Sequence, residues 1–464
     1  MNAIPRPNLA DLARKDEKIL LMAVELALKD DIILRQATEI ASLKALVAEL
    51  KAKNETPPPN PGNSSVPPSA ARKPNGDGQS KPRGSSHAGA HRPLHPNPTS
   101  RRDVLATRCR CGCDVADAAQ SACEAYDKIE LPPIKPDVTR VTLFGGTCPR
   151  CKGKFKADAP ADMPRGSPFG PNLRAFVLYL RFTHGISLER LAHLFSDLLG
   201  LEISEGAIVN IISAAAPAFA KQTGAIRARL LAGTALESDE TGMRVGKKNH
   251  WLWVFHHGLD AVFVADPSRA RRVVEEFLGD WRPEYWVSDR YGGQLGWATR
   301  ENQICLAHFI RDARRALEWG DLVFAPKLIQ LLQRACRIGR RRERLADATL
   351  KTYAGRLNAS LDELMKLAAS HDAGKKLQKV VKKVRRHMFV FVTHRAIPAT
   401  NNGSERALRP AAVFRKITNG FRTAWGVKFY ADIRSVVETA RRRSISAFDA
   451  IRLTLAGEFI PVVA

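Results

Sequence analysis

The sequence predicts a multidomain α/β protein, and three observations support this prediction. The 464 residues are enough for about three domains. Apolar residues follow a helical period over most of the chain, but they alternate as in β-strands between 234 and 293. A stretch rich in proline, glycine, serine and asparagine, 56–103, separates an N-terminal helical pattern from everything that follows.

The charge balance points to a polyanionic partner. The chain has 73 lysine and arginine residues against 47 aspartate and glutamate residues, a formal net charge of +26. Nucleic acid leads the possible partners, and a membrane surface is the rival. No apolar run is long enough to span a membrane, and the N-terminus lacks a secretory apolar region. We therefore expect a soluble cytoplasmic protein whose eight cysteines serve as thiols and metal ligands rather than disulfides.

The N-terminal segment, 1–55, carries a heptad pattern typical of a coiled-coil helix. One seam is apolar throughout, and the second is apolar at half of its positions, which indicates register control or a weak dimer. The first seam consists of Leu12, Ile19, Leu26, Ile33, Ile40 and Val47, and the second of Lys15, Met22, Lys29, Gln36, Leu43 and Leu50. The alternative is a single amphipathic helix packed on its own protein. The segment 56–103, expected to be a disordered tether, favours the coiled coil and hence a homodimer.

The segment 104–158 is expected to resemble a zinc ribbon. Cys148 and Cys151 form a C-x-x-C pair, and a strand-like stretch separates them from a first cysteine group. In that group Cys109 and Cys111 are the expected ligands, with Cys113 as the alternative to Cys111. Reduced thiols without a metal are the competing interpretation.

The segment 165–232 is expected to be helical and to contact DNA. Apolar residues recur at helical spacing, Gly200 ends one predicted helix, and Ser204 caps the next. This order is compatible with a helix-turn-helix, although an ordinary helical hairpin is equally compatible.

Strand patterns begin at 234. Three strands are predicted at 234–245, 250–258 and 260–268, followed by a helix at 269–280 and a strand at 284–293. Three antiparallel strands, a crossover helix and a further strand are the opening order of a ribonuclease-H-like fold. We expect 233–310 to form the first part of this core and 395–464 to complete it with C-terminal helices.

Two aspartates stand out on the predicted strands. Asp239 lies within the first strand, and Asp289 lies on the strand after the crossover helix. Carboxylates buried on neighbouring strands would repel each other, unless a divalent cation lies between them. Two Mg²⁺ ions, about 3.5–4 Å apart in such sites, activate a water or a 3′-hydroxyl and stabilise the leaving oxygen in phosphoryl transfer.

Glu405 is the predicted third carboxylate. It follows Asn402 by three residues, the spacing of a capping box, and so lies in the first turn of a predicted helix. A purely capping role is the alternative. The two aspartates favour a catalytic role for Glu405.

The motifs SDETG, SDRYGG, CLAH and NNGSERALRP, in this order, resemble those of the DDE transposases of the insertion-sequence-66 class. The resemblance implies that Asp239, Asp289 and Glu405 are catalytic. It also implies a zipper-like N-terminal helix, a zinc-binding segment and accessory proteins from the same mobile element. The first cysteine group and the sequence DRYGGQ depart from the family pattern. Such a protein would act on the DNA of the bacterial nucleoid.

The segment 311–394 is predicted to be a basic helical insertion. It contains 20 lysine and arginine residues against 8 acidic residues. A DNA-binding track is the favoured interpretation, and a solvated basic face is the alternative. The predicted DNA contacts are Arg340, Arg341, Arg342, Lys382, Lys383, Arg385 and Arg386 in the insertion, with Arg406, Arg409, Arg415 and Lys416 after Glu405. Cys305 and His308 have three open roles: packing, orienting a metal ligand or contacting a phosphate.

These observations predict a transposase that cleaves DNA at the terminal inverted repeats of an element and joins the 3′-hydroxyl to target DNA. Two rival functions remain. One is a structure-selective nuclease of the same fold, and the other is a DNA-binding regulator without catalysis.

Overall fold

The structure is a computed structural model of the chain. It describes residues 18, 22, 25–26, 29–44, 46–47 and 92–462. The chain divides into two compact units, which we call the helical unit (1–71 and 282–402) and the sheet unit (72–281 and 403–464). Among the described residues, no helix combines the length and the apolar character needed to cross a lipid bilayer.

The sheet unit contains three long antiparallel strands, β3 (Ala235–Val245), β4 (Lys248–His257) and β5 (Asp260–Asp266). Strand β4 pairs with β3 on one side, where Asp239 faces Val254, and with β5 on the other. Both hairpin turns start at a glycine in the left-handed region, Gly246 with φ 57° and Gly258 with φ 53°. Such turns twist with the strands they connect, which explains why these two connections are so short.

The free edge of β5 is covered by helix α11 (Ala424–Arg442). The Ser435 hydroxyl accepts a hydrogen bond from the backbone N–H of Phe263 at 2.8 Å. The Thr439 hydroxyl accepts one from the N–H of Ala261 at 3.1 Å and donates to the carbonyl of the same residue at 3.2 Å. The helix thus satisfies backbone groups that an edge strand would otherwise offer to another chain.

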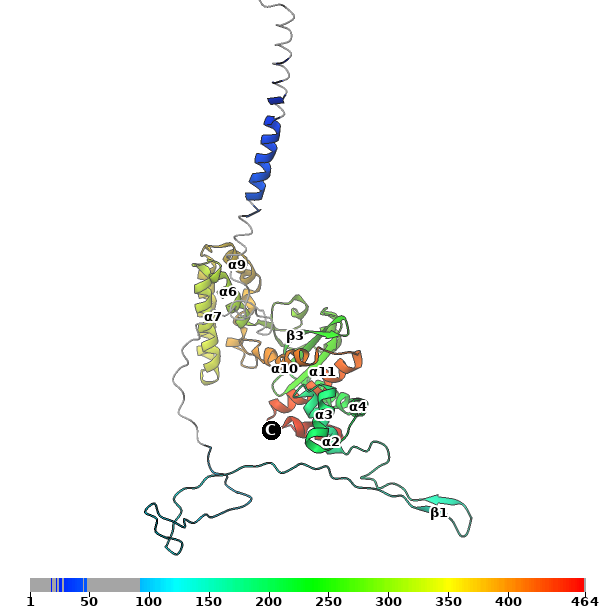
Figure 1. Cartoon of the computed structure of the whole chain (residues 1–464). Coiled ribbons are helices and arrows are strands. Elements are labelled where there is room, and N and C mark those ends of the chain that lie inside the picture. Colours follow the sequence, from blue (N-terminus) through cyan, green and yellow to red (C-terminus); the bar gives the residue numbers. More distant parts are fainter. Residues whose placement is uncertain are drawn as a thin grey trace, which may run out of the picture. The chain divides into compact units, whose positions relative to one another are not determined.

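Further helices of the sheet unit include α2 (Pro171–Phe182), α3 (Leu188–Leu199), α4 (Glu205–Leu230), α5 (Arg272–Leu278) and α12 (Ala447–Leu455). Gly200, with φ 61°, ends α3, and the Ser204 hydroxyl caps α4 by accepting from the N–H of Ala207, as the sequence predicts. Helices α2, α3 and α4 lie together (Figure 1), and α4 also packs on α11.

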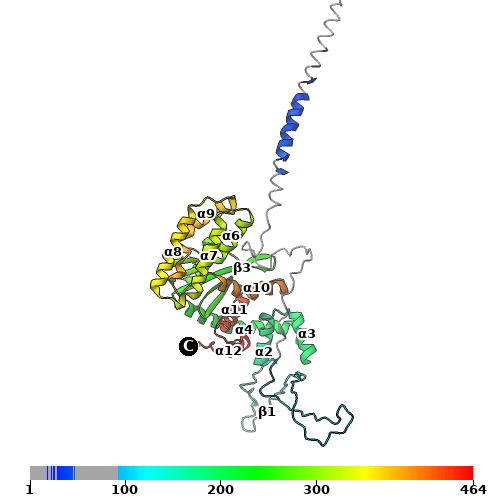
Figure 2. The ribbon, with the colours of Figure 1, turned by 90° about the vertical axis from the view of Figure 1, so that its left-hand side faces the viewer.

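The helical unit begins with two short parallel strands, β6 (Tyr285–Ser288) and β7 (Glu301–Ile304). They are followed by α6 (Leu306–Glu318), α7 (Phe324–Arg341), α8 (Asp347–Met365) and α9 (Asp372–Val384). Figure 2 shows these four helices side by side. The sequence did not predict β7, because its four residues, ENQI, show no strand alternation.

A buried aspartate holds the start of α7. Asp321 is fully buried, and its carboxylate accepts backbone N–H groups from Ala325 at 2.8 Å and from Ser370 at 2.9 Å. The same carboxylate accepts the Ser370 hydroxyl at 3.1 Å. Because these donors come from α7 and from the turn before α9, Asp321 joins two parts of the bundle that are far apart in sequence.

The mixed α/β class is therefore confirmed, whereas the ribonuclease-H-like core, the zinc ribbon and the coiled coil stay predictions. Residues 29–44 are helical, with the seam residues Ile33 and Ile40 exposed. Leu12 and Ile19 of the same seam, and most of the predicted linker, lie outside the described residues. In the cysteine segment, β1 (Gly145–Thr147) and β2 (Lys154–Lys156) form a short antiparallel hairpin.

Gly374→Ala should destabilise the helical unit. A Cβ added at Gly374 would lie 2.2 Å from the Asp321 carboxylate, which cannot move without breaking its backbone hydrogen bonds. We expect a loss of about 1–3 kcal/mol, typical of overpacking, measured as a lower thermal midpoint by circular dichroism.

Gly355→Ala is the matched control, because this helical glycine in α8 has open space around its Cβ position. It should stabilise the helix by up to about 1 kcal/mol. Equal effects of the two substitutions would contradict the role assigned to Gly374.

Candidate active site

Asp239 and Glu240 are adjacent carboxylates with different surroundings. Glu240 pairs with Arg269, whose Nε donates to Oε1 at 2.6 Å and whose guanidinium lies 4.9 Å from the Trp251 ring centre. The Asp239 carboxylate accepts the backbone N–H of Glu240 at 2.9 Å. Because neighbouring strand residues point to opposite faces, Asp239 shares a face of β3 with Glu237.

Glu237 belongs to a buried polar cluster that reaches helix α10 (Asn402–Thr418). His256 on β4 is 1% exposed, and its Nε2 lies 2.8 Å from the hydroxyl of the fully buried Ser404. Its Nδ1 lies 3.6 Å from a carboxylate oxygen of Glu237, which is too long for a hydrogen bond. Gly403 fits here because an added Cβ would lie 3.0 Å from the His256 ring.

Burial sets the protonation of this cluster. It raises the pKa of Glu237 to about 7, against the smaller opposing effects of Arg442 and Arg406. Burial also lowers the pKa of His256 well below its ordinary value, and the positive charge of Arg442 adds to this. His256 is therefore neutral at neutral pH and able to share a hydrogen bond with Ser404 without carrying a buried charge.

Helix α10 is attached to β3 at further points. The Arg415 guanidinium donates to the carbonyl of Gly242. After the helix, Phe421 exchanges backbone hydrogen bonds with the end of the strand: its N–H donates to Arg244 at 2.9 Å, and its carbonyl accepts from Gly246 at 2.7 Å. Helix α10 is thus fastened to the β3–β4 hairpin at its start, near its end and just beyond it.

Glu405 follows Ser404 directly, and it lies in the first turn of α10 as the sequence predicts. On β3, Asp239 lies between Glu237, which a Cβ at Gly403 would approach to 3.5 Å, and Gly242, whose carbonyl accepts from Arg415. Two of the three predicted carboxylates therefore belong to elements of the sheet unit that are held together. Both side chains are partly exposed.

Asp289 lies in the helical unit, directly after β6. Its carboxylate accepts the backbone N–H of Tyr291 at 2.7 Å, so the turn that begins here is stabilised by the aspartate itself. The next residue, Arg290, pairs with Asp312 of α6 and lies over the ring of Phe309, 4.6 Å from its centre. These contacts fix the chain directly after Asp289.

Cys305 has a positioning role in the helical unit. It is fully buried, and its backbone N–H donates to the carbonyl of Ser288 at 2.9 Å. Its sulfur accepts the backbone N–H of Asn401 at 3.1 Å. Cys305 therefore joins the strand end beside Asp289 to the segment that leads into α10. The sequence left three roles open for this motif, and the contacts of Cys305 favour packing and orientation.

Within the part of the chain that the structure describes, no group of three His, Cys, Asp or Glu side chains is arranged to hold a metal ion. Each cysteine group is nonetheless ordered locally. The pKa of Cys111 is lowered by the backbone N–H of Cys113, then by the thiols of Cys109 and Cys113. The pKa of Cys148 is lowered by the backbone N–H groups of Cys151 and Arg150, then by the Cys151 thiol. A lowered pKa favours the thiolate, the form that binds metals.

The predicted DNA contacts differ in their surroundings. Arg340, Arg341, Lys382, Lys383, Arg386, Arg406, Arg409 and Lys416 are exposed. Arg385 is also exposed, and it pairs with Asp362. Arg415 is engaged with Gly242, as described above.

Arg342 has a structural environment that the sequence did not reveal. Its guanidinium donates to the backbone carbonyls of Phe391, Arg395 and Ile397, and its side chain is only 12% exposed. It therefore holds the segment 391–397, and its contact with DNA stays a prediction. The sequence contains no usable signal for this role, because Arg342 and the segment 391–397 are far apart in the chain and only the fold brings them together.

The raised pKa of Glu237 predicts a pH-dependent stability. The folded protein retains this proton between the ordinary pKa of 4.5 and about 7, so the contribution of Glu237 to stability falls as the pH rises through this window. Glu237→Gln removes the titration. The stability of this variant relative to wild type, measured from the thermal midpoints of both proteins, should therefore rise between about pH 5 and about pH 8. The rise in the free energy of unfolding should not exceed about 3 kcal/mol.

Glu275→Gln is the control, because Glu275 is an exposed glutamate of α5 in the same unit. Its stability relative to wild type should stay constant across the same pH range. A Glu237→Gln profile parallel to that of wild type would show that Glu237 titrates normally.

A family model described as the Transposase IS66 family matches residues 166–429. The matched region begins just before α2, ends within α11, and includes Asp239, Asp289 and Glu405; the N-terminal helix and the cysteine segment lie outside it. A comparison of the chain with curated proteins gave no match. Because the family model covers more than half of the chain, the protein belongs to the IS66 family of transposases.

Proposed function

We propose that this transposase cleaves DNA at the ends of its element and joins the freed 3′-hydroxyl to target DNA, with Asp239, Asp289 and Glu405 as the catalytic carboxylates. The observation that carries the proposal is the fastening of α10 to the β3–β4 hairpin through Ser404 and His256. It attaches the helix of Glu405 to β4, the strand paired with the strand of Asp239; the two carboxylates lie 166 residues apart in sequence.

The three side chains offer only carboxylate oxygens, the ligands that Mg²⁺ prefers. Two bound Mg²⁺ ions would activate a water or a 3′-hydroxyl and stabilise the leaving oxygen. Asp239 projects from a strand, Asp289 is fixed by its own turn, and Glu405 lies on a helix that is tied down at its first turn. Carboxylates on such rigid supports lose little entropy when they bind a cation.

Residues after Glu405 are suited to hold the phosphate. Arg409 follows Glu405 by four residues and therefore projects from the same face of α10. Arg406 lies close enough to Glu237 to lower its pKa, so its positive charge acts at the buried cluster. We assign these two arginines to the scissile phosphate. Arg415 holds the helix through Gly242 instead.

The basic residues of the insertion would carry the flanking DNA. Arg340, Arg341, Lys382, Lys383, Arg385 and Arg386 would contact phosphates, setting affinity and register rather than sequence preference. The cysteine segment and the helices α2, α3 and α4 would recognise the terminal repeats. The N-terminal helices of two protomers would pair so that both element ends react together, with accessory proteins of the same element as further partners. The site of action would be the bacterial nucleoid, in the cytoplasm.

Asp239→Asn should reduce strand cleavage by about a hundredfold or more, because the loss of one carboxylate charge weakens cation binding where charge develops. Binding of element ends should remain nearly unchanged. Both are measured with labelled DNA ends, target DNA and Mg²⁺, and Asp280→Asn, at an exposed position of the sheet unit, provides the control.

The same assay separates the rival functions. A structure-selective nuclease would cut branched DNA without strand transfer, and a regulator would bind DNA with all three carboxylates replaced. Loss of binding together with cleavage in Asp239→Asn would count against the catalytic assignment.

We also propose that Cys109, Cys111, Cys148 and Cys151 bind one structural zinc ion, with Cys113 as the alternative to Cys111. The purified protein should contain about one zinc per chain by elemental mass spectrometry, and Cys148→Ser with Cys151→Ser should remove it. Cys123→Ser is the matched control. Equal zinc content in both variants would refute the assignment.

A further inference from the structure

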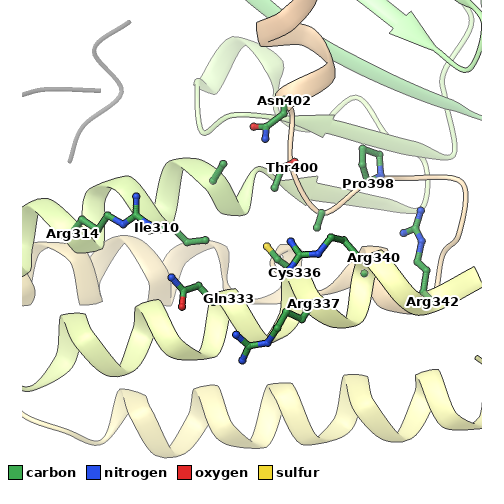
Figure 3. A pocket seen from close by; sticks show the side chains of 13 residues that line it. Ile310, Arg314, Gln333, Cys336, Arg337, Arg340, Arg342, Pro398, Thr400 and Asn402 are labelled. Carbon is green, nitrogen blue, oxygen red and sulfur yellow. The ribbon is translucent and has the colours of Figure 1, made fainter. Parts of the chain in front are cut away.

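A cavity of about 640 Å³ lies in the helical unit, between α6, α7 and the segment 398–402. Figure 3 shows Ile310 and Arg314 on α6, with Gln333, Cys336, Arg337 and Arg340 on α7. The spacings of three, four and seven residues on α7 place these four side chains on one helical face. The sequence therefore builds one wall of the cavity from a single polar stripe.

The lining of the cavity is cationic. Arg314, Arg337, Arg340 and Arg342 contribute to it, and none of its lining residues is acidic. Arg342 uses its donors on backbone carbonyls, as described above. The side chains of Arg314, Arg337 and Arg340 are exposed, and among the described residues no ion pair or hydrogen bond engages their guanidinium groups. Three forked donors are thus available to an anionic ligand.

The remaining lining is suited to a nucleobase. Ile310 and Pro398 supply apolar surface, and Gln333, Thr400 and Asn402 supply amide and hydroxyl groups. A small anion would leave most of the cavity empty, whereas a volume in the range of about 300–1,000 Å³ is typical of sites for organic ligands. Stacked bases of a duplex are shielded within the helix, but an unpaired nucleotide offers its base and its phosphate together.

The cavity lies beside the start of the helix that carries the proposed catalytic Glu405. Asn402, at its edge, is the first residue of α10 and precedes Glu405 by three residues, one helical turn. A strand held in the cavity would therefore pass close to the helix that carries the proposed catalytic glutamate.

We propose that this cavity binds one unpaired nucleotide of a DNA strand, with its phosphate held by Arg337 and Arg340 and its base against Ile310 and Pro398. The inference rests on the proposed function for its choice of DNA. It adds a site for single-stranded DNA that the catalytic carboxylates do not require. Unpaired nucleotides arise at element ends when the strands separate for cleavage and joining.

The first test is direct binding of a fluorescent single-stranded oligonucleotide by the full chain, without divalent cations, so that no strand chemistry occurs. Arg337→Gln with Arg340→Gln should weaken binding about tenfold or more, and should lower the salt slope by about 0.7, because one phosphate is no longer neutralised. Arg334→Gln with Arg344→Gln removes the same charge from exposed positions outside the cavity lining. This control should weaken binding less than about threefold.

The second test uses Cys336, which lines the cavity and is partly buried. Burial raises the pKa of its thiol, so labelling by a maleimide is followed at mildly alkaline pH, with peptide mass spectrometry as the readout. A saturating single-stranded oligonucleotide should slow the labelling of Cys336 about tenfold or more, while a polyglutamate of equal charge should not.

Three results would overturn the inference: equal weakening by the two double variants, unchanged labelling of Cys336 when the oligonucleotide is bound, or equal protection by duplex DNA or polyglutamate. Failure of the catalytic proposal gives a different pattern. Single-stranded DNA would then still protect Cys336, although the chain showed no strand cleavage with Mg²⁺.

Discussion

Helix α10 begins where a buried histidine, His256, meets the hydroxyl of Ser404 at 2.8 Å, and the proposed active site depends on this contact. Burying two polar groups is costly unless they form a hydrogen bond with each other. This requirement fixes the position of the first turn of the helix. Glycine at position 403 allows this position, because a larger side chain there would be too close to the His256 ring. The next residue in the chain is Glu405.

The cluster around His256 also explains how acidic and basic groups coexist under the helix. Burial disfavours charge on both Glu237 and His256, which moves their pKa values in opposite directions, toward the neutral form of each. The cationic residues that follow, Arg406 and Arg442, moderate the shift of Glu237 and add to that of His256. The result is a polar attachment that carries less charge than its residues would carry in water, beside a strand that contains the partly exposed Asp239.

The helical unit uses the same strategy with different residues. Cys305 receives the N–H of Asn401 on its sulfur and gives its own N–H to Ser288, so a single buried residue fixes the strand end before Asp289 and the approach to α10. Asp321 holds the start of α7 in a comparable way. Arg337 and Arg340, exposed on α7, make no ion pair or hydrogen bond with the described residues, whereas Arg342 donates to the backbone of 391–397 and to the carboxylate of Glu343.

Local patterns carried much of the prediction. Strand alternation located β3, β4 and β5, and helical periodicity with Gly200 and Ser204 located α3 and α4, because these signals arise from neighbouring residues. The strand β7 was missed because its short sequence has no alternation. The three carboxylates were chosen from spacing and from motifs that the family model also covers.

The sequence by itself determined the secondary structure around Asp239 and Glu405, the basic character of the insertion and the family of the protein. Only the tertiary structure showed that Glu240 pairs with Arg269 and that Arg342 donates to backbone carbonyls. It also showed that His256 and Cys305 position the elements that carry the carboxylates. The physical reason is that a contact between residues far apart in sequence produces no periodic pattern in either segment. A buried hydrogen bond depends on which two segments the fold brings together, and the sequence of one segment does not identify the other.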